Sequence, residues 1–218
     1  MSETIRILVV EDDPATLRNL LCWLGTIAGL EVVGCAMSGA EAIAQIPALC
    51  PDLLLLDLEL PDTDGIEITR WTRAHHPDSE VLILTSFEDE TKVFLAMQAG
   101  ASGYLVKRMI PSRIQEAIRE VMAGGVVLEP RLARRFWNLF QSVKTGGEAA
   151  DPTLALEGVE RDVLIMIGRG LTNQEAGEVL KLKRRTVKSI LARIYGKLGT
   201  HSRSEAVVIA LRKGLIEL

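Results

Sequence analysis

The sequence predicts an α/β fold with a doubly wound, five-stranded parallel sheet, followed by a small all-α domain. Up to about Gly124, short apolar runs alternate with helical patterns, which is the arrangement of βαβ units. After Leu154 the pattern is purely helical, and a stretch rich in glycine and other breakers separates the two parts. A chain of 218 residues that is 48% hydrophobic is long enough for two domains, each with its own core.

Five short apolar runs are the strand candidates of the first domain. They are Ile5–Val10, Glu31–Ala36, Leu53–Asp57, Glu80–Thr85 and Ser102–Val106. Near-continuous aliphatic runs of this length are typical of buried parallel strands. Helical patterns lie near residues 14–28, 38–48, 65–75, 89–99 and 111–123. Right-handed crossovers between the strands would place these helices on both faces of the sheet.

The second half predicts a linker and a helical domain. Gly124-Gly125 ends the fifth helix, so we expect the first domain to span residues 1–125. A linker with a short amphipathic helix at Glu129–Val143 would span 126–153, and the helical domain 154–218. Its helices are expected near 159–169, 173–181, 184–198 and 203–213. Thr172 and Glu175 fit a capping box at the start of the second of these helices.

The charge of the chain is unevenly distributed. Residues 154–218 hold 12 Lys and Arg against 7 Asp and Glu, a balance of +5, so the first 153 residues carry −9 of the total of −4. An acidic front and a basic back predict two domains with different partners.

With no apolar stretch of about 18 residues and no signal-peptide pattern, we expect a cytoplasmic protein. Cys22, Cys35 and Cys50 are odd in number and have apolar neighbours, which predicts buried core thiols.

Charged residues stand at the ends of three predicted strands. Glu11-Asp12-Asp13 follows the first strand, Asp57 ends the third and Lys107 follows the fifth. Because parallel strands deliver their carboxyl ends to one edge, we expect these side chains to meet. Clustered carboxylates repel one another, and Mg²⁺, which prefers oxygen ligands, would compensate them. Beside Mg²⁺ and Lys107, Asp57 is the best candidate to attack a phosphoryl group. The alternative, that these acids only cap helices or fill a loop, accounts for single acids better than for the whole set.

A basic helix is the main feature of the second domain. Residues 181–197 contain no acid and seven bases: Lys181, Lys183, Arg184, Arg185, Lys188, Arg193 and Lys197. Val187, Leu191, Ile194 and Leu198 form an apolar stripe, which leaves Arg185, Lys188, Ser189 and Ala192 facing outward. Bases at a helix N-terminus oppose the macrodipole, and the approach of a polyanion would explain them. A basic helix after a short capped helix and a tight turn is typical of a helix-turn-helix. A solvated run of charge is the alternative.

Four motifs of the first domain are Val9–Asp13, Asp57–Gly65, Leu84–Ser86 and Gly100–Lys107. With these motifs the domain resembles the receiver domain of bacterial response regulators, which has a flavodoxin-like fold. The resemblance implies that Asp57 accepts a phosphoryl group from a sensor histidine kinase. Mg²⁺ would be held by Glu11, Asp12, Asp57 and the backbone carbonyl of Glu59, although the acidic pair of the family maps either to Glu11-Asp12, which we favour, or to Asp12-Asp13. Thr85 would bind a phosphoryl oxygen, Tyr104 would turn inward, and Lys107 would pair with the phosphate.

The second domain has the motifs Glu160–Leu164, Gly170–Glu175, Thr186–Lys188, Lys197–Gly199 and Ser202–Ala206. With these motifs it resembles the helix-turn-helix domain of LuxR-type regulators, and the whole chain resembles their NarL/FixJ group. By this resemblance Lys188 and Ser189 would reach bases, Arg184, Arg185 and Arg193 phosphates or base edges, and Lys197 a phosphate. Departures from the family pattern are Glu157-Gly158, Gly177, Lys183, Ile190 and Ala192.

Together these features predict a phosphorylation-controlled transcriptional regulator that binds double-stranded DNA, as a homodimer once it is activated. It would be a phosphoacceptor and not an enzyme in its own right, with self-catalysed phosphotransfer and slow dephosphorylation. Two alternatives are open. One is a phosphohydrolase that turns over an aspartyl phosphate, and the other is a signalling module whose divergent helix-turn-helix binds protein.

Overall fold

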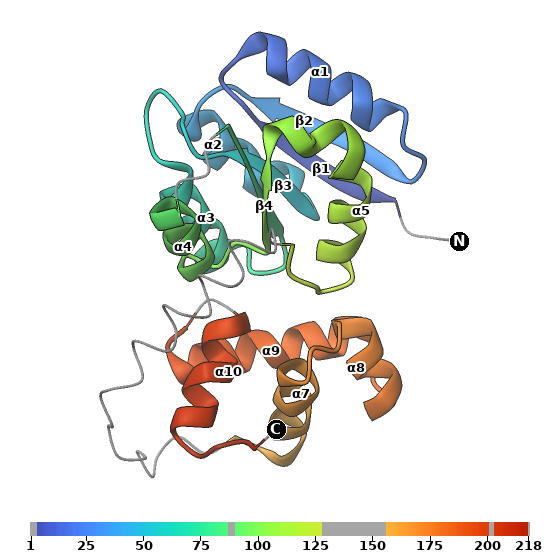
Figure 1. Ribbon diagram of the computed structural model, residues 1–218, viewed down its shortest axis with the longest axis vertical. Coiled ribbons are helices and arrows are strands. Elements are labelled where there is room, and N and C mark those ends of the chain that lie inside the picture. The colour runs from blue at the N-terminus through green and yellow to red at the C-terminus, as the bar shows by residue number, and fades with distance from the viewer. Residues whose placement is uncertain (1–3, 87–89, 128–155, 201–202, 218) are drawn as a thin grey trace. The chain divides into compact units, whose positions relative to one another are not determined.

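The computed structural model describes residues 4–86, 90–127, 156–200 and 203–217. The chain divides into two compact units, one built on the residues up to Met122 and one that contains the C-terminal helices, and each has a hydrophobic core of its own (Figure 1). The linker helix predicted at residues 129–143 lies outside the described residues. Within the described ranges, no helix is both long and apolar enough to span a membrane.

A five-stranded parallel sheet forms the centre of the first unit, as predicted. The strands are β1 (Ile5–Val10), β2 (Leu30–Ala36), β3 (Leu53–Asp57), β4 (Glu80–Thr85) and β5 (Gly103–Val106), in the order β2-β1-β3-β4-β5. The chain passes from β1 to β2 on one side of β1 and then crosses over to β3 on its other side. In such sheets ligands bind outside the carboxyl ends of the strands at the point of reversal, here between β1 and β3.

Helices cover both faces of the sheet (Figure 1). They are α1 (Pro14–Gly25), α2 (Gly39–Leu49), α3 (Gly65–His75), α4 (Glu90–Gln98) and α5 (Ile110–Met122), with a short 3₁₀ helix η1 (Lys107–Met109) before α5. Ile7 and Val9 pack in one core cluster with α1 and α5. Leu8 and Val10 are equally buried and, because side chains alternate along a strand, face the layer of α2, α3 and α4. The aliphatic runs seen in the sequence are therefore strands buried on both sides.

The chain returns to the sheet after α5. The backbone N–H of Tyr104 donates to the carbonyl of Val127 at 2.8 Å, and the N–H of Val127 donates to the carbonyl of Ser102 at 3.3 Å. Val127 is buried in the core cluster of the first unit. Residues that the sequence analysis assigned to the start of the linker thus lie against the outer edge of β5.

The prediction of buried core thiols was wrong, because Cys22, Cys35 and Cys50 are all exposed. Cys22 lies between the buried residues Leu20 and Leu24 of α1 but two positions from each, so it points away from the core. Cys35 lies in β2, an edge strand, and Cys50 caps the C-terminus of α2 in a left-handed conformation. Apolar sequence neighbours therefore did not indicate the face on which each thiol lies.

Four helices make up the described part of the second unit: α7 (Gly158–Gly168), α8 (Asn173–Leu180), α9 (Arg184–Leu198) and α10 (Arg203–Arg212). The predicted apolar stripe of α9 is buried, together with Val163 and Leu164 of α7 and Ala206 of α10. The predicted capping box is present at the start of α8, where Thr172 and Glu175 satisfy each other's backbone N–H groups. The unit is therefore a small helical bundle around α9.

Candidate functional site

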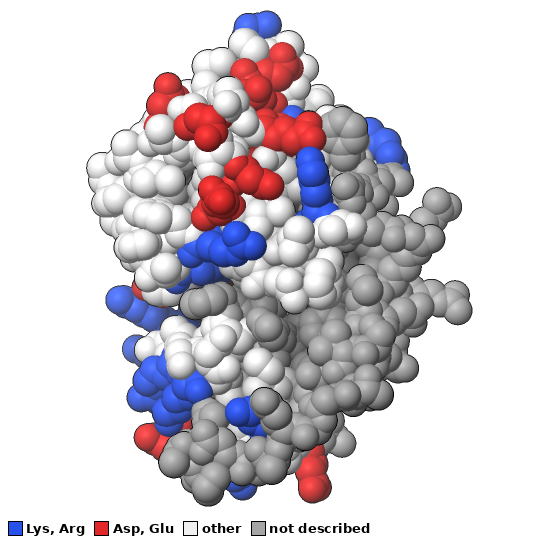
Figure 2. All heavy atoms as spheres, turned by 90° about the vertical axis from the view of Figure 1, so that its left-hand side faces the viewer, with Lys and Arg blue, Asp and Glu red and all other residues white. Residues whose placement is uncertain are grey.

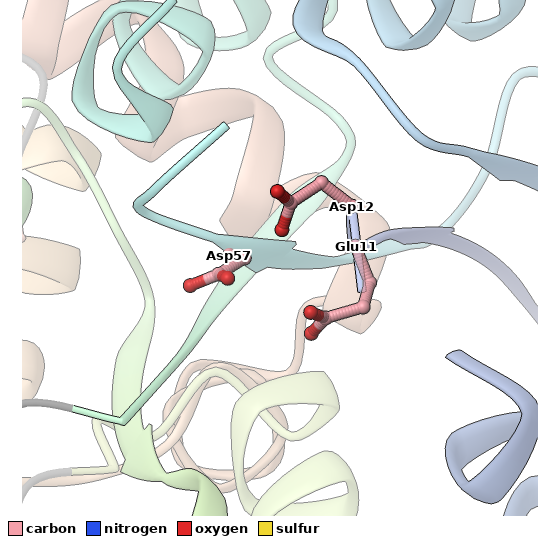
Figure 3. Close-up of side chains that lie close together, drawn as sticks. All are labelled: Glu11, Asp12 and Asp57. Atoms are coloured by element: carbon pink, nitrogen blue, oxygen red, sulfur yellow. The ribbon is translucent and has the colours of Figure 1, made fainter. Parts of the chain in front are cut away.

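Three carboxylates meet where β1 and β3 end (Figure 3). Glu11 and Asp12 follow β1 directly, and Asp57 is the last residue of β3. Val10 is paired with Leu56 in the sheet, so the residues that follow them are delivered to the same edge. One carboxylate oxygen from each of Glu11, Asp12 and Asp57 lies within 4.8 Å of the others. The predicted convergence of acids at a strand edge is thus what the fold produces.

The third acid of the triplet has a different partner. Asp13 is the N-cap of α1, and its Oδ2 accepts hydrogen bonds from the backbone N–H of Thr16 at 2.8 Å and from its hydroxyl at 2.6 Å. These hydrogen bonds lower the pKa of Asp13. Of the two mappings left open by the sequence, the geometry therefore favours Glu11-Asp12 as the pair that faces Asp57.

Lys107 joins the two buried acids. Its Nζ donates to Asp57 Oδ2 at 2.8 Å and to Glu11 Oε1 at 2.8 Å. Glu11 Oε2 is also close to this nitrogen, at 2.6 Å, but accepts no well-directed hydrogen bond from any described residue. Glu11 is 1% exposed and Asp57 6%. One cation thus serves two buried carboxylates that come from different strands.

Burial dominates the electrostatics of the cluster. It raises the pKa of Asp57 and of Glu11 above their ordinary values, and the hydrogen bonds and charge of Lys107 oppose this only in part. For Lys107, burial lowers the pKa, but the hydrogen bonds to Asp57 and Glu11 outweigh it, so that its pKa is raised. All three pKa values are therefore raised, those of the two acids by burial and that of Lys107 by its two anionic partners.

The donor set fits a hard divalent cation. The side-chain candidate ligands are all carboxylate oxygens, and Glu11 Oε2 is a buried acceptor that no described donor satisfies with a well-directed hydrogen bond. Mg²⁺ binds through one or two carboxylates and fills the rest of its octahedron with water and phosphate oxygens. Glu59 lies two residues beyond Asp57, and its side chain forms an ion pair with Lys92 of α4 at 2.8 Å. Only its backbone carbonyl is a candidate for the metal.

Thr85 and Tyr104 lie on the two strands beyond Asp57. Thr85 ends β4, next to β3, and Tyr104 lies in β5, where it is paired with Ile83 of β4. Each of the two side chains is only 1% exposed. Tyr104 is therefore directed into the protein in this structure, which is the orientation that the sequence analysis assigned to the activated form.

The loop after Asp57 is held close to the site. The N–H of Gly65, at the start of α3, donates to the carbonyl of Leu58 at 2.9 Å. A Cβ atom at Gly65 would lie 2.4 Å from the carbonyl oxygen of Asp57, so this position requires glycine. Asp62 of the same loop accepts hydrogen bonds at 2.8 Å from Gly39 and Ala40 at the start of α2. This second anchor was not visible in the sequence, because it depends on the loop crossing to another helix.

The second candidate site is the exposed side of α9. Arg184, Arg185 and Ser189 are exposed, and Lys188 is partly so, whereas Val187 and Ile190 are buried. Ile190 therefore belongs to the core, although the resemblance places histidine at this position. In the described part of the chain, no side-chain hydrogen bond caps the N-terminus of α9 at Lys183. Two bases of its first turn, Arg184 and Arg185, are exposed beside this N-terminus.

The turn before α9 accounts for one departure from the family pattern. Lys181 adopts a left-handed conformation with φ of 57°, and the N–H of Leu182 donates to the carbonyl of Gly177 at 2.8 Å. A Cβ atom at Gly177 would lie 2.6 Å from the carbonyl oxygen of Leu182. Gly177 is thus required by the close approach of the turn to α8, and it is not simply a weak helix former.

The remaining predicted DNA contacts lie beside a buried acid. Glu160, in the first turn of α7, is 1% exposed, and its Oε2 accepts from Lys197 Nζ at 2.7 Å and from the N–H of Glu157 at 2.9 Å. Arg193 Nε lies 3.7 Å from Glu160 Oε1. This cluster was not predicted, because the spacing of Glu160 and Lys197 along the chain carries no signal of contact.

Charge is segregated in the structure as it is in the sequence. Figure 2 shows acidic side chains gathered on one face of the first unit, in the upper part of the view. Exposed acids near the candidate site include Asp12, Asp13, Asp62 and Asp64. The second unit is the basic one, as the balance of its sequence requires.

Comparison with known proteins gave two family matches. The model described as the response regulator receiver domain matches residues 7–119, and the model described as bacterial regulatory proteins of the luxR family matches residues 159–210. These two stretches contain all the residues of the two candidate sites.

Relatives are similar over nearly the whole chain. The DNA-binding transcriptional activator DevR/DosR of Mycobacterium tuberculosis is 37% identical over 206 residues, which are 94% of each chain. The response regulator protein VraR of Staphylococcus aureus is 33% identical over 214 residues, 98% of this chain and 100% of VraR. Among solved structures, the response regulator ChrA of a heme-sensing two-component system aligns with a TM-score of 0.51 and 30% identity, over 98% of this chain and 99% of ChrA.

Proposed function

Because the chain belongs to the response regulators that join a receiver domain to a LuxR-family regulatory domain, we propose that Asp57 is its phosphoacceptor and that phosphorylation controls DNA binding by α9. The domains would span residues 1–125 and 154–218, with the linker between them. The family membership makes the chain a transcriptional regulator. The chemistry assigned to individual residues below is our proposal.

One observation carries the proposal for the receiver. The Nζ of Lys107 lies 2.8 Å from Asp57 Oδ2 and 2.8 Å from Glu11 Oε1, with Asp12 beside them at the carboxyl edge of the sheet. A carboxylate that is fixed by a lysine and flanked by further acids is suited to accept a phosphoryl group, because cations on both sides neutralise the oxygens of that group.

The phosphotransfer step follows from this geometry. An oxygen of Asp57 attacks the phosphorus of a phosphohistidine, the bond between phosphorus and the imidazole nitrogen breaks, and its electron pair returns to the ring. Lys107 then exchanges its hydrogen bond to Asp57 for one to a phosphoryl oxygen, and the hydroxyl of Thr85 donates to another. We propose a sensor histidine kinase as the donor, in keeping with the family.

Mg²⁺ would be held by Glu11, Asp12, Asp57 and the carbonyl of Glu59, and it would supply positive charge to the oxygens of the transferred phosphoryl group. Such an ion would also stabilise the ionised forms of Glu11 and Asp57, whose pKa is raised by burial. The chain itself positions the acids, because β1 and β3 are paired in register up to the residues that precede them.

The output would be DNA binding through the exposed N-terminal part of α9. Arg184 and Arg185 would contact phosphates or base edges, and Lys188 and Ser189 would reach bases in the major groove. A related protein, 37% identical, is described as a DNA-binding transcriptional activator, which supports this assignment. We further propose that two copies bind paired half-sites, because a single helix-turn-helix reads a short site.

Phosphorylation would act through Thr85 and Tyr104. A phosphoryl group on Asp57 draws the hydroxyl of Thr85 toward the site, and the buried orientation of Tyr104 on the neighbouring strand is stabilised in the space this leaves. The face formed by α4, β5 and α5 would then favour dimerisation. The phosphoryl group and the second copy can shift the equilibrium between the inactive and active states only as far as they favour one state over the other.

The phosphoacceptor is tested by incubating the full chain with acetyl phosphate, with and without Mg²⁺, and measuring its intact mass. We expect the mass of one phosphoryl group to be added in the presence of Mg²⁺ and not in its absence, and Asp57→Asn to remain unmodified. Equal modification of Asp57→Asn would assign the phosphoryl group to another residue and refute the proposal.

The output is tested by titrating a labelled DNA duplex with the phosphorylated chain at several salt concentrations. Contacts with phosphates release counterions, so the logarithm of the binding constant should fall by about 0.9 per neutralised phosphate for each tenfold rise in salt. A module that binds protein instead would show no saturable binding to the duplex.

A further inference from the structure

The basic side chains of α9 fall into two groups by their surroundings. Arg184 and Arg185, near its N-terminus, are exposed, and no described acid pairs with them. Lys197, in its last turn, donates to the buried carboxylate of Glu160 at 2.7 Å and lies 3.9 Å from Glu157 Oε1. The cation at the C-terminal end of the helix therefore already has anionic partners within its own domain.

Helix geometry separates the same two groups. Lys188 and Lys197 are nine residues apart, which is about two and a half turns of an α-helix, so they point to opposite sides of α9. The buried stripe passes through Val187, Ile194 and Leu198. Lys197 flanks this stripe on the side that packs against α7, where Glu160 lies. A groove that receives Lys188 cannot then receive Lys197 on the same face.

We propose that Lys197 is a positioning residue, not a DNA contact: held by Glu160, it fixes α9 against α7 and neutralises no DNA phosphate. This inference rests on the proposed binding of DNA by α9. It replaces the phosphate contact that the sequence resemblance implied for Lys197. Arg193, one turn before Lys197 on the same side of α9, has a side chain that is 56% exposed and an Nε that lies 3.7 Å from Glu160 Oε1.

Because Glu160 is buried, Lys197 cannot serve both this carboxylate and a DNA phosphate. The side chain of Glu160 is 1% exposed while Lys197 covers it, so a lysine that turned to a phosphate would leave this carboxylate without its nearest cation. Removing one partner of a buried ion pair leaves an uncompensated charge, which costs far more than an exposed ion pair contributes. Arg193 is too far away for a good hydrogen bond and cannot take the place of Lys197.

The ion pair of Glu160 and Lys197 links the start of α7 to the end of α9. Glu160 lies in the first turn of α7 and also accepts the N–H of Glu157, while Lys197 lies in the last turn of α9. A shift of α9 along or around its axis would break this contact first. Glu160 and Lys197 thus set the direction in which Arg185 and Lys188 are presented, although neither of them touches DNA.

The test compares full-length variants on a labelled DNA duplex of random sequence across a range of salt concentrations. Arg185→Ala removes a proposed phosphate contact, Lys197→Met removes the proposed positioning cation, and Lys197→Arg restores its charge. Thermal unfolding of each variant, followed by hydrogen exchange of α7–α10, shows that the domain is folded at the temperature used. If Lys197→Met is unfolded there, Lys197→Gln replaces it.

We expect Arg185→Ala to flatten the salt dependence by about 0.9 in the log-log slope. Lys197→Met should keep the wild-type slope, weaken binding by the same factor at every salt concentration and unfold at a lower temperature, with both defects rescued in Lys197→Arg. Glu160→Gln should reproduce Lys197→Met, and the double variant should add little.

A flattened slope for Lys197→Met, equal to that of Arg185→Ala, would overturn the inference and restore Lys197 as a phosphate contact. Unchanged affinity of folded Lys197→Met would also overturn it, since the lysine would then stabilise the fold without positioning α9. If the wild-type chain shows no saturable binding, the proposed DNA-binding function itself fails, and this assignment falls with it.

Discussion

At the scale of single residues, Lys107 is the group on which the receiver site depends. It is the partner of two buried acids, whereas Lys92, in the same domain, forms one exposed ion pair with Glu59. Buried and exposed pairs differ in energy because water screens the second and cannot reach the first. The two lysines therefore provide a matched comparison.

We predict that Lys107→Met lowers the free energy of unfolding of the receiver by about 3 kcal/mol in the absence of Mg²⁺, because Glu11 and Asp57 lose their shared cation. Mg²⁺ should bind this variant more tightly than wild type, since the ion no longer competes with the lysine for the acids. Phosphorylation should nevertheless be slower. The measurements are urea unfolding, calorimetric Mg²⁺ titration and the rate of mass increase with acetyl phosphate.

The control for this prediction is Lys92→Met, which should change the free energy of unfolding by less than about 1 kcal/mol because its pair is exposed. Equal losses in the two variants, or weaker Mg²⁺ binding by Lys107→Met, would contradict the role given to Lys107.

Glu160 predicts a pH dependence of the second domain. Burial alone would raise its pKa, but the hydrogen bonds from Lys197 and from the N–H of Glu157 outweigh burial and lower the pKa below its ordinary value of 4.5. An acid whose pKa is lowered by folding contributes stability above its unfolded pKa and loses that contribution as the pH falls through the folded value. Wild type should therefore lose stability on acidification below 4.5 more steeply than Glu160→Gln.

Hydrogen exchange of peptides from α7–α10, measured from neutral to acidic pH, checks this expectation. The stability difference between wild type and Glu160→Gln should shrink as the pH falls. A difference that stays constant over the whole range would show that the ionised form of Glu160 does not stabilise the domain.

The residues of the receiver site were predictable from the sequence, and the Glu160 cluster was not. Asp57 and Lys107 follow aliphatic runs, and the parallel topology alone brings the ends of such runs together. Glu160 and Lys197 meet because α7 and α9 pack at one particular angle and rotation. No periodicity in the sequence encodes that rotation, and only the family resemblance assigned Lys197 to a DNA phosphate.

At the scale of secondary-structure elements, two glycines in the helix-turn-helix have opposite roles. A Cβ atom at Gly177 would meet the carbonyl oxygen of Leu182 at 2.6 Å, whereas a Cβ atom at Gly196 meets nothing within 4 Å. Both lie inside helices, where glycine costs up to about 1 kcal/mol relative to alanine. Only at Gly196, in α9, can a substitution by alanine remove this cost without a clash.

We predict that Gly196→Ala raises the stability of the second domain by up to about 1 kcal/mol, through the helix propensity of alanine. Gly177→Ala should lower it by about 1 to 3 kcal/mol, because the turn before α9 must move to accept the methyl group. Hydrogen exchange of α7–α10 measures both changes without interference from the receiver. If both substitutions raised the stability of the domain, helix propensity alone would determine the effect of alanine at these two positions.

The elements themselves were largely predictable, because their signals are local. Aliphatic runs marked the five strands to within one residue at their ends, and Thr172 and Glu175 marked the start of α8. The faces of the elements were less predictable where burial depends on position in the fold. Cys35 is exposed because β2 is an edge strand, and Val127 is buried because the chain returns to β5.

At the scale of the whole molecule, the two domains have charges of opposite sign, −9 up to residue 153 and +5 from residue 154. We propose that the acidic receiver takes up a cation and a phosphoryl group and that the basic domain binds DNA. Coupling between them is a free energy that both ligands share. If phosphorylation tightens DNA binding, then DNA must favour phosphorylation by the same factor, whatever the structural path between the sites.

We predict that phosphorylation of Asp57 tightens binding of a specific duplex by about tenfold or more, within the range of 5- to 150-fold that is typical of coupled sites. In the reverse direction, a saturating concentration of the same duplex should raise the equilibrium ratio of phosphorylated to unphosphorylated protein by an equal factor. The first quantity is measured by DNA titration of the two forms, and the second by intact mass at equilibrium with a reversible phosphodonor.

Two variants separate the parts of this cycle. Asp57→Asn should bind DNA with the unphosphorylated affinity whether or not the donor is present, which isolates the effect of the phosphoryl group. Arg185→Ala should accept the phosphoryl group normally but need a higher duplex concentration to show the same shift, because the lost phosphate contact weakens binding to both forms alike. If the two factors were unequal, a third state, such as a dimer that forms without DNA, would have to carry the difference. If phosphorylation left DNA affinity unchanged and DNA left the extent of phosphorylation unchanged, the receiver and the helix-turn-helix would act independently.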